Sequence, residues 1–578
     1  MKRLRINGHE VTVKDDATIL DAARQINIDI PTLCHLKIEE IGYDNKPGSC
    51  RVCIVENADT GRLVPACVTP VEEGMNINTE SIQAVRARRT NVELLLSDHP
   101  NACLTCAKNT KCDLQKLAHD LGVREMKYGG EQSDYSIDKG SKSIVRDANK
   151  CILCNRCETM CTEVQTVGAL SMVGRGFESY VGSAYHLPMN DTTCTFCGQC
   201  LSICPTGALT EEDNTEELWE YLADPKKFVI VQTAPAVRVA LGEEFGLPAG
   251  TDVTGKMVSA LRVMGFDRVF DTNYAADLTI MEEASEFIDR VENDGKLPIL
   301  TSCCPGWVRF FETQFHDMLD IPSSAKSPHE MFGAVAKTYL AKQMDIDPKD
   351  IVCVSIMPCV AKKYEASRME LSVDGNPDVD LVITTRELAR LIKESGIHFT
   401  HLPEEYFDNL MGESTGAGAI FGATGGVIEA TLRTAHSWLT GDDLTVVEFR
   451  ELQGFTGVKE TSVDIAGREF KIAVCNGLGN TRKVLEALRD GDVYYDAIEV
   501  MACPGGCIGG AGQPYHHGDM SILTKRTETI HKIDRQSEIR LSHENPMIKK
   551  LYAEFLGEPY GEKAHELLHT YHKAKPTR

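Results

Sequence analysis

The sequence has few basic residues relative to acidic ones: 61 Lys and Arg stand against 85 Asp and Glu, a formal charge of -24. A charge of this sign argues against a nucleic acid or an anionic membrane as the partner. No apolar run has the length of a membrane span, and residues 1–10 lack the apolar centre of a signal peptide, so we expect a cytoplasmic protein. With 42% hydrophobic residues over 578 positions, the chain is long and apolar enough to fold as several globular domains.

Cysteine is absent from residues 205–302, and this gap divides the chain into two territories. Of the 22 cysteines, 15 lie between Cys34 and Cys204, and the other seven are scattered from Cys303 to Cys507. Structural disulfides are rare in a reducing compartment, so clustered cysteines predict metal binding.

Residues 2–13 alternate apolar and polar side chains around Asn7-Gly8, which predicts a β-hairpin. Further patterns predict a helix at 17–26, a strand at 62–68, a helix at 81–97 and a polar linker at 129–147. This region therefore begins with a small sheet.

From about residue 228 short apolar runs alternate with amphipathic helices, a pattern typical of an α/β domain. The predicted strands are 228–231, 297–300, 351–356, 381–384, 470–474 and 497–500. Three of them end just before cysteines, so Cys303/Cys304, Cys359 and Cys503/Cys507 are expected to converge beyond the carboxyl ends of the strands. A helical segment at 545–571 is expected to pack as an appendage.

An internal repeat of C-x2-C-x2-C-x3-C is the clearest motif. Its two copies are Cys151, Cys154, Cys157, Cys161 and Cys194, Cys197, Cys200, Cys204. In two-cluster bacterial ferredoxins three cysteines of one copy and the fourth of the other hold each 4Fe-4S cluster. Cys204 is therefore expected to join the first three cysteines, and Cys161 the second set. Zinc knuckles are the alternative, but zinc sites rarely repeat four cysteines at this pitch.

Two further ligand sets precede the repeat: Cys34, Cys50, Cys53, Cys67 and His99, Cys103, Cys106, Cys112. The first has a central C-x2-C with two distant partners, as in plant-type 2Fe-2S proteins, although its first gap is longer; a zinc ribbon fits the same spacing. The second, H-x3-C-x2-C-x5-C, suits zinc or a 4Fe-4S cluster. A series of clusters needs members that pass electrons, which zinc does not do, so iron and sulfur are favoured.

Three loops in the second territory hold cysteines among prolines and glycines. Their sequences are TSCCPGW at 301–307, MPCVAKKYE at 357–365 and MACPGGC at 501–507. Cys353 and Cys475 instead lie within or at the end of apolar strands and are interpreted as buried thiols. The three loops closely resemble the three signature segments of the iron-only (FeFe) hydrogenases, and the preceding cluster series resembles the large monomeric clostridial type of that family.

The resemblance covers essentially the whole chain and implies a multidomain fold of α/β and α+β type. The implied domains are a β-grasp 2Fe-2S ferredoxin-like domain at 1–80, a 4Fe-4S domain with one histidine and three cysteine ligands at 81–128, a two-cluster 4Fe-4S bacterial ferredoxin-like domain at 140–210, a two-lobed α/β H-cluster catalytic domain at 225–530 and a C-terminal helical segment like a small subunit at 535–578. The implied cofactors are one 2Fe-2S cluster, three accessory 4Fe-4S clusters and the H-cluster, a 4Fe-4S cubane bridged to a diiron unit with CO, cyanide and azadithiolate.

The resemblance also assigns the cysteines of the signature loops. Cys304, Cys359, Cys503 and Cys507 would hold the cubane, with Cys507 as the bridge to the diiron unit. Cys303 would be the proton donor. Adjacent side chains in an extended loop point apart, so one can face the cubane and the other the diiron unit.

Other pocket positions follow from matched segments. Lys362 would hydrogen-bond a cyanide, a role that satisfies a buried ammonium. The residues matched to the pocket wall are Pro235, Ala236, Met357, Phe421 and Met501. Ordinary core packing explains the apolar ones equally well. His329 stands where some relatives have glutamine, Ala236 where some have serine, and Ala511 interrupts the usual glycine run.

The family's proton path would run through Cys303, Glu283, Ser323 and Glu286 toward Arg290. Glu283, Glu286 and Arg290 are spaced to share one face of a helix. A solvated acidic face is the alternative for these residues.

The implied activity is that of a ferredoxin-dependent hydrogenase, which reduces protons reversibly to H2 with electrons from a soluble ferredoxin or flavodoxin. Dedicated maturation enzymes would supply the diiron unit. The alternatives are a redox sensor on the same scaffold and an electron-relay subunit like that of respiratory NADH dehydrogenase. Direct nicotinamide binding is disfavoured, because Arg482 occupies the third glycine position after Gly477-Leu478-Gly479.

Overall fold

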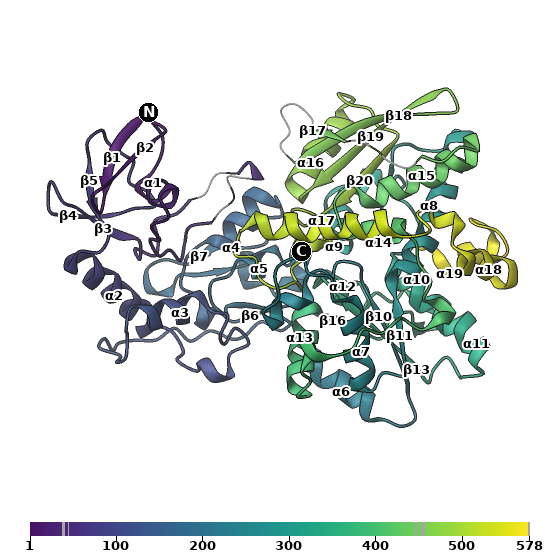
Figure 1. The fold of residues 1–578 in the computed structure, drawn as a ribbon, viewed down its shortest axis with the longest axis horizontal. Helices are drawn as coiled ribbons and strands as arrows, with labels where there is room; N and C mark the ends of the chain where they lie inside the picture. The colour runs from purple at the N-terminus through teal and green to yellow at the C-terminus, as the bar shows by residue number, and fades with distance from the viewer. Residues whose placement is uncertain are drawn as a thin grey trace.

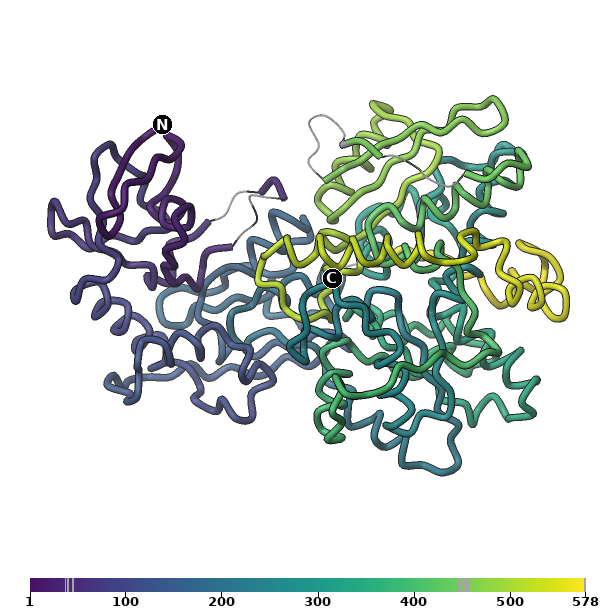
Figure 2. Tube along the Cα trace, viewed as in Figure 1, coloured from purple at the N-terminus to yellow at the C-terminus, as the bar shows by residue number. Residues whose placement is uncertain are grey.

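The computed structural model describes residues 1–575 except 37, 39, 40, 44, 45, 445, 446, 448 and 452–456. The molecule is elongated, with the N-terminal sheet at one end and the larger C-terminal part at the other (Figures 1 and 2). Among the described residues, no helix is both long and apolar enough to cross a membrane.

The first domain is a five-stranded sheet packed against one helix. Its strand order is β2-β1-β5-β3-β4, with β1 Lys2–Ile6, β2 His9–Val13, β3 Ile54–Asn57, β4 Arg62–Pro65 and β5 Asn76–Asn78. The predicted hairpin is confirmed: Ile6 pairs with His9, and Asn7 and Gly8 both have positive φ, as a tight primed turn requires. Helix α1 (Ile19–Gln25) begins with a capping box between Thr18 and Asp21.

The second region is built from short elements around the cysteine motifs. They include α2 Ile82–Ser97, α3 Asp113–Asp120, β6 Ile144–Arg146, α4 Arg156–Thr159, β7 Ser171–Val173, β8 Tyr180–Gly182, α5 Gln199–Ser202 and β9 Leu209–Glu211. The two copies of the cysteine repeat also share their backbone conformation. Leu153 and Asn155 before α4 have φ of 53° and 60°, and the equivalent Phe196 and Gly198 before α5 have φ of 56° and 72°. β6, at the end of the predicted linker, pairs with β9 and closes this region.

Two sheets form the C-terminal part. The first is wholly parallel, in the order β11-β10-β13-β16, with β10 Phe228–Thr233, β11 Arg268–Asp271, β13 Ile351–Met357 and β16 Leu381–Thr384. The second has the order β12-β20-β19-β18-β17, with β12 Ile299–Leu300, β17 Arg450–Glu451, β18 Val458–Ile465, β19 Arg468–Asn476 and β20 Ala497–Met501. All six predicted strands are confirmed, with ends that differ by a few residues.

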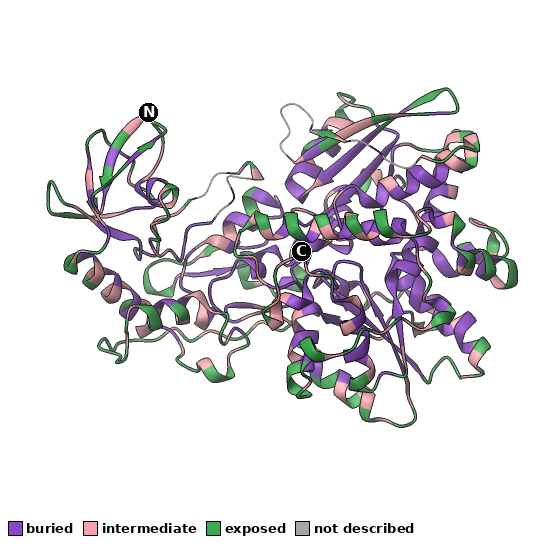
Figure 3. Cartoon of the chain, in the orientation of Figure 1, coloured by how far each residue is buried: buried purple, intermediate pink, exposed green. Residues whose placement is uncertain are grey.

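Helices cover these sheets and bury them, as the interior colouring in Figure 3 shows. The main ones are α7 Thr254–Met264, α8 Thr272–Glu292, α9 Pro305–Gln314, α10 Pro328–Val335, α12 Ala361–Glu365, α13 Thr385–Glu394, α14 Gly416–Ile420, α15 Gly426–Thr440 and α16 Leu478–Asp490. Helix α8 is buried over most of its length and lies against α10, α14 and α15. It therefore carries polar side chains into the interior between the two sheets.

The C-terminal segment begins with α17 (Met520–Gln536), which packs against α14. The predicted helical segment at 545–571 is broken in the structure into α18 (Pro546–Leu551), a following wide turn and α19 (Glu562–Leu568). Gly557, with φ of 90°, ends the first piece, because a left-handed residue cannot continue a helix. Leu551, Leu567 and Leu568 are buried in the core of the first parallel sheet, so the expected packed appendage is confirmed.

The cysteine-repeat region and the C-terminal part share one apolar core. Phe196 and Leu201 belong to the same buried cluster as Trp307 and Val360. A Cβ at Gly198 would lie 2.4 Å from Val360 Cγ2 and 2.5 Å from Ala511 Cβ, so the contact requires glycine there and leaves room for no more than a methyl group at Ala511. This contact brings the second cysteine set to the loops that follow β13 and β20.

Candidate active site

A cavity of about 80 Å³ lies between the two sheets, at the carboxyl ends of β10, β12, β13 and β20. Its lining includes the five signature-loop cysteines, Cys303, Cys304, Cys359, Cys503 and Cys507. The loops after three strands thus converge, as expected for an open α/β sheet. Cys353 and Cys475 are fully buried in strands away from this lining, as predicted.

Local contacts fix the loop that carries Cys303 and Cys304. Cys304 caps α9, where Pro305 occupies the first helical position and the Val308 N–H donates to Cys304 O at 3.0 Å. The buried indole N–H of Trp307 donates to Thr301 O at 3.0 Å. The helix start and this indole together hold the two adjacent thiols on one rigid turn.

The loop that carries Cys503 and Cys507 depends on its glycines. Gly505 and Gly506 have φ of 81° and 89°, and a Cβ at Gly506 would lie 2.8 Å from Thr424 N. A side chain at Gly506 would therefore push the loop away from the cavity, and Cys507 with it.

Lys362 is the cation of the cavity. It lies on α12, is buried, and donates to Glu365 Oε2 at 2.6 Å and to Cys303 O at 3.1 Å. The residues expected to wall the pocket also line it, and they are Pro235, Ala236, Met357, Phe421 and Met501. The cavity therefore combines soft thiol donors, one ammonium and a largely apolar wall.

A buried network that the sequence did not predict supports Lys362 from behind. Glu365 Oε2 also lies 2.6 Å from His329 Nε2 and accepts from Ser327 Oγ at 3.0 Å. Burial and the Lys362 charge lower the pKa of His329, but the carboxylates of Glu330 and Glu365 outweigh them and raise it. The two carboxylates thus favour the protonated form of the His329 imidazole beside the cavity.

The residues of the expected proton path lie along α8, in the loop after β12 (Cys303) and in the segment between α9 and α10 (Ser323). Ser323 Oγ donates to Glu286 Oε2 at 2.8 Å, and Arg290 Nη2 donates to Glu286 Oε1 at 2.6 Å. Glu283 is next to Cys303: the amide of the neighbouring Ser302 donates to Glu283 Oε1 at 3.5 Å. Glu283 and Glu286 are 2% and 1% exposed, which excludes the solvated acidic face.

The two carboxyl groups differ in their surroundings. Burial and, next, repulsion from Glu286 raise the pKa of Glu283 to about 8. Its Oε2 is buried and has no hydrogen-bond partner among the described residues. Glu283 is thus able to hold a proton near neutral pH, while Glu286 is bonded to a serine and a guanidinium.

A second hydrogen-bonded branch leaves Glu286 through the C-terminal segment. Ser324 Oγ donates to Glu286 Oε2 at 3.3 Å and lies 2.8 Å from His569 Nδ1, while His569 Nε2 lies 2.9 Å from Glu282 Oε2. The hydroxyl of Tyr552 donates a hydrogen bond to Glu282 Oε1, where the branch ends. Sequence reasoning missed this branch, because its members are 245 or more residues apart across the Ser324–His569 and Glu282–His569 contacts.

The cysteine repeat lines two small cavities in the alternating pattern expected from its spacing. Cys151, Cys154, Cys157 and Cys204 line one, and Cys161, Cys194, Cys197 and Cys200 line the other. A Cβ at Gly306 would lie 3.4 Å from Cys197 Cα, so the second cavity borders the loop of Cys304 directly.

The two remaining sets lie farther toward the N-terminus. His99, Cys103, Cys106 and Cys112 line a third small cavity, where His99 Nδ1 is buried and has no hydrogen-bond partner among the described residues. In the first domain Cys53 Sγ lies 3.3 Å from Cys67 Sγ, and the Gly48 N–H donates to Cys34 Sγ at 3.2 Å. Cys50 is buried in the same apolar cluster as Cys34.

The sulfur spacing distinguishes clusters from single ions. Four sulfurs around one zinc ion, each about 2.3 Å from it, would lie about 3.8 Å apart. Among the described residues, the only three metal-ligating side chains whose donor atoms all lie within 4.8 Å of one another are His329, Glu330 and Glu365. No three sulfurs of a described cysteine set are that close together, although Cys53 and Cys67 are 3.3 Å apart, so the sets fit the larger iron-sulfur clusters better than a single zinc ion.

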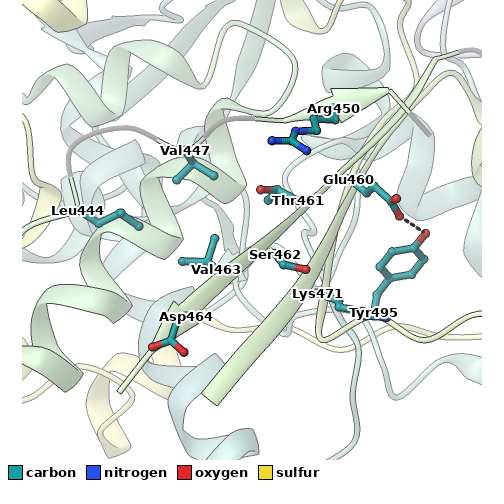
Figure 4. A pocket seen from close by; sticks show the side chains of 10 residues that line it. All are labelled: Leu444, Val447, Arg450, Glu460, Thr461, Ser462, Val463, Asp464, Lys471 and Tyr495. Atoms are coloured by element: carbon teal, nitrogen blue, oxygen red, sulfur yellow. Dashed lines mark hydrogen bonds between the residues drawn. The ribbon is translucent and has the colours of Figure 1, made fainter. Parts of the chain in front are cut away.

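Another hollow lies away from all these cysteines. It is open to the surface over β18, and Figure 4 shows Glu460, Thr461 and Lys471 around it, with Tyr495 donating to Glu460 at 3.4 Å. Among its described lining residues there is no cysteine or histidine. The thiol-lined cavity between the sheets is therefore the candidate active site.

Comparison with known proteins agrees with this choice. A family profile described as "Iron only hydrogenase large subunit, C-terminal domain" matches residues 227–511, the part that contains the cavity. "Iron hydrogenase 1" of Clostridium pasteurianum is 40% identical over 99% of this chain and 100% of its own length. This chain belongs to the iron-only hydrogenase family. It is an oxidoreductase of that family, with an H-cluster domain.

Other matches cover the rest of this hydrogenase. Profiles for a 2Fe-2S cluster binding domain, an NADH-ubiquinone oxidoreductase-G iron-sulfur binding region, a 4Fe-4S dicluster domain and an iron hydrogenase small subunit match residues 2–81, 88–127, 134–208 and 520–575. The chain is thus a hydrogenase with N-terminal iron-sulfur domains, which overturns the alternative of an electron-relay subunit alone.

Two further relatives are informative. The "NADP-reducing hydrogenase subunit HndD" of Solidesulfovibrio fructosivorans is 56% identical over 99% of both chains. A solved apo form of the FeFe-hydrogenase HydA1 from Chlamydomonas reinhardtii is 43% identical, covers 63% of this chain and 99% of its own, and superposes with a TM-score of 0.58.

The loop at which nicotinamide binding is disfavoured has a structural role. Gly477 and α16 follow β19, and the Leu478 N–H donates to Gln165 Oε1 at 3.0 Å. A Cβ at Gly479 would lie 2.5 Å from Val164 O. The turn docks against the cysteine-repeat region, which leaves no space for a dinucleotide there.

Proposed function

We propose that this hydrogenase combines protons and electrons reversibly to H2 in the cavity between its two sheets. The observation that carries the proposal is the convergence of five cysteines from three loops on one buried cavity beside a single lysine. Cys304, Cys359, Cys503 and Cys507 would hold the cubane of the H-cluster, with Cys507 bridging to the diiron unit. The bound H-cluster supplies the iron at which the proton and electrons meet.

The chain's own residues would position and protect that group. Lys362 would donate to a cyanide, with Glu365 and Cys303 O orienting its ammonium. Pro235, Ala236, Met357, Phe421 and Met501 would exclude water. Ala236 is held by its carbonyl, which accepts from Gln513 Nε2 at 2.8 Å, although it lacks the hydroxyl that some relatives have.

Protons would enter from Arg290 and reach the cavity through Glu286, Ser323, Glu283 and Cys303. The contacts from Arg290 to Ser323 support the outer half of this path. The inner half is supported by the closeness of Glu283 to the Cys303 loop and by its raised pKa of about 8.

Electrons would pass between the surface and the cavity through one 2Fe-2S and three 4Fe-4S clusters. The loop after Cys204 supports transfer between the cluster of the His99 set and the cluster that Cys204 would join, since a Cβ at Gly207 would lie 2.6 Å from Cys106 Sγ. The contact of Gly306 with Cys197 supports the last step. The cavities of the repeat support the division of its ligands, with Cys204 joining the first copy and Cys161 the second.

Either direction is energetically accessible. The proton/H2 couple lies at roughly -410 mV at pH 7, from about 59 mV per pH unit for one electron. Plant-type ferredoxins have potentials near about -400 mV. The difference between the two reduction potentials is therefore small. The concentrations of H2, protons and reduced donor would decide whether H2 is formed or consumed.

For the electron partner we propose a ferredoxin or flavodoxin in the cytoplasm, and maturation enzymes as suppliers of the diiron unit. A second candidate is a partner subunit that reduces NADP, which the 56% identity to an NADP-reducing hydrogenase subunit favours.

Purified, matured protein distinguishes the two partners. The first predicts H2 evolution from reduced ferredoxin by this chain alone. The second predicts little ferredoxin activity by the chain alone, and H2-dependent NADP reduction once partner subunits are added. Failure to evolve H2 even from reduced methyl viologen, with the H-cluster fully loaded, would contradict the proposed function.

A further inference from the structure

A buried lysine borders the cavity of His99, Cys103, Cys106 and Cys112. Lys108, in the loop between two of these cysteines, lines that cavity and is 2% exposed. Its Nζ is buried and has no hydrogen-bond partner among the described residues. A buried charge is costly unless an opposite charge compensates it, so a negative group is expected nearby.

One aromatic side chain holds this ammonium in place. Lys108 Nζ lies 3.3 Å from the centroid of the Tyr515 ring, and Arg386 lies over the same ring at 4.3 Å. The contact attracts the cation but brings no negative charge. Tyr515 follows the third signature loop, so the C-terminal part of the chain fixes a lysine at an N-terminal cluster site.

The neighbouring charged groups are already paired. Arg386 forms a two-point ion pair with Glu211, with distances of 2.8 and 3.1 Å. Lys150, which lines the same cavity, lies 2.9 Å from Asp147 Oδ2. Asp113 is shared by Arg156 and His517 at 3.3 and 3.5 Å. Lys108 alone among these cations has no carboxylate in contact.

The missing counter-charge fits an iron-sulfur cluster. Among the described residues, the favourable charge that acts most strongly on Lys108 is the Cys204 thiol of the neighbouring set, and the His99 set lines the cavity that Lys108 borders. A 4Fe-4S core held by three thiolates and one neutral imidazole has a net negative charge, which increases by one on reduction. The reduced state therefore gains more from a nearby cation than the oxidised state does, and net charge at the site is one of the factors that set a cluster's potential.

We propose that Lys108 is the counter-ion of the iron-sulfur cluster at His99, Cys103, Cys106 and Cys112, and that its charge raises the reduction potential of this cluster. The inference rests on the proposed presence of a 4Fe-4S cluster there, and not on the H2 reaction. Lys108 thereby makes this cluster easier to reduce than its ligands alone would.

Redox titration of the whole protein, followed by electron paramagnetic resonance, tests the proposal. We expect Lys108→Met to weaken reduction of this cluster about tenfold, a shift of about 59 mV to lower potential for one electron. Lys108→Arg keeps the charge and should leave the potential near that of the wild type. Lys150→Met is the matched control, because it removes a cation of the same cavity that Asp147 already pairs, and its shift should be clearly smaller.

Every outcome bears on the counter-ion role. An unchanged potential in Lys108→Met with the cluster intact would overturn it, as would an equal shift in Lys150→Met. If Lys108→Met and Lys108→Gln both fail to retain the cluster while Lys108→Arg retains it, the charge is required for assembly, which supports the role. Loss in all three variants would show that packing matters and not charge. H2 evolution with methyl viologen is measured separately, so failure of the hydrogenase function leaves this test intact.

Discussion

The region proposed to carry electrons and the region proposed to carry protons are built differently. Three of the cysteine sets of the N-terminal half line separate small cavities, and neighbouring sets are joined by single close contacts such as Gly207 with Cys106. The proton side is a chain of touching polar groups on α8 and its neighbours, from Arg290 through Glu286 to Ser323. Electrons cross packed protein between clusters, whereas a proton needs a donor and an acceptor in hydrogen-bond reach.

This difference predicts how each region fails. Removing one member of the proposed proton chain should lower H2 evolution with every electron donor, because each donor depends on the same proton supply. Removing one cluster should lower H2 evolution only with those donors whose electrons must pass through that cluster.

The largest effect is expected at the junction of the two regions. Cys303→Ala should abolish H2 evolution with any donor while the infrared bands of CO and cyanide remain, because the thiol is proposed to deliver the proton and not to bind iron. Cys353→Ala is the control, since it removes a thiol fully buried in β13 and should keep activity. Normal H2 evolution by Cys303→Ala would refute the proton role.

Within the proton chain, Glu286→Gln should lower H2 evolution by about 10²–10⁴-fold, the usual contribution of a positioned acid or base. The amide keeps one hydrogen bond but does not exchange a proton at neutral pH. Glu292→Gln, an exposed position at the end of the same helix, should have no effect. Equal rates in the two variants, measured with methyl viologen, would argue for another route.

On the electron side, Cys106→Ser should remove most ferredoxin-driven H2 evolution and leave methyl viologen-driven evolution largely intact. Small dyes reach the later clusters directly, whereas a protein donor depends on the first ones. A parallel loss of both activities would mean that the His99 site is structural, and iron content would show whether only one cluster was lost.

The pH dependence of Glu283 sharpens the comparison further. Burial, followed by repulsion from Glu286, raises its pKa from 4.5 to about 8, so the group is protonated at pH 7 and loses its proton as the pH rises through 8. Infrared difference spectra between pH 6 and pH 9.5 should show loss of a carboxylic acid band that is absent in Glu283→Gln. A band in neither protein at pH 6 would mean that Glu283 is ionised there.

The smallest effect is expected at the C-terminal branch. His569→Gln should reduce activity a few-fold, because losing one hydrogen bond is worth about 0.5–1.5 kcal/mol. His565→Gln is the matched control: this ring stacks on His569 with centroids 4.2 Å apart but is exposed. If both variants match the wild type, Ser324 and His569 only support Glu286 and carry no proton.

Much of this fold was predictable because its signals are local. The Asn7-Gly8 turn, the six apolar strand runs and the pitch of the cysteine repeat each depend on residues within one element or loop, and the structure has all of them. The convergence of Cys303 and Cys503 on one cavity also followed, since β12 and β20 are parallel neighbours in one sheet. Cys359 follows β13 of the other sheet, so its place in the cavity depends on how the two sheets pack.

The rest depends on contacts that no local pattern encodes. Lys108 meets Tyr515, and Ser324 meets His569, only through tertiary packing. The break at Gly557 is different, because Gly557, Pro559 and Gly561 are local signals of a helix end that the apolar pattern outweighed in the prediction. The roles of Cys303 and Cys304 were separated by family resemblance, since both thiols line the same cavity.

Infrared spectroscopy of the matured protein tests the central claim most directly. We expect CO and cyanide stretching bands in the wild-type protein and their loss in Cys507→Ser, the variant that lacks the sulfur proposed to bridge to the diiron unit. Full iron loading without such bands in the wild-type protein would contradict it.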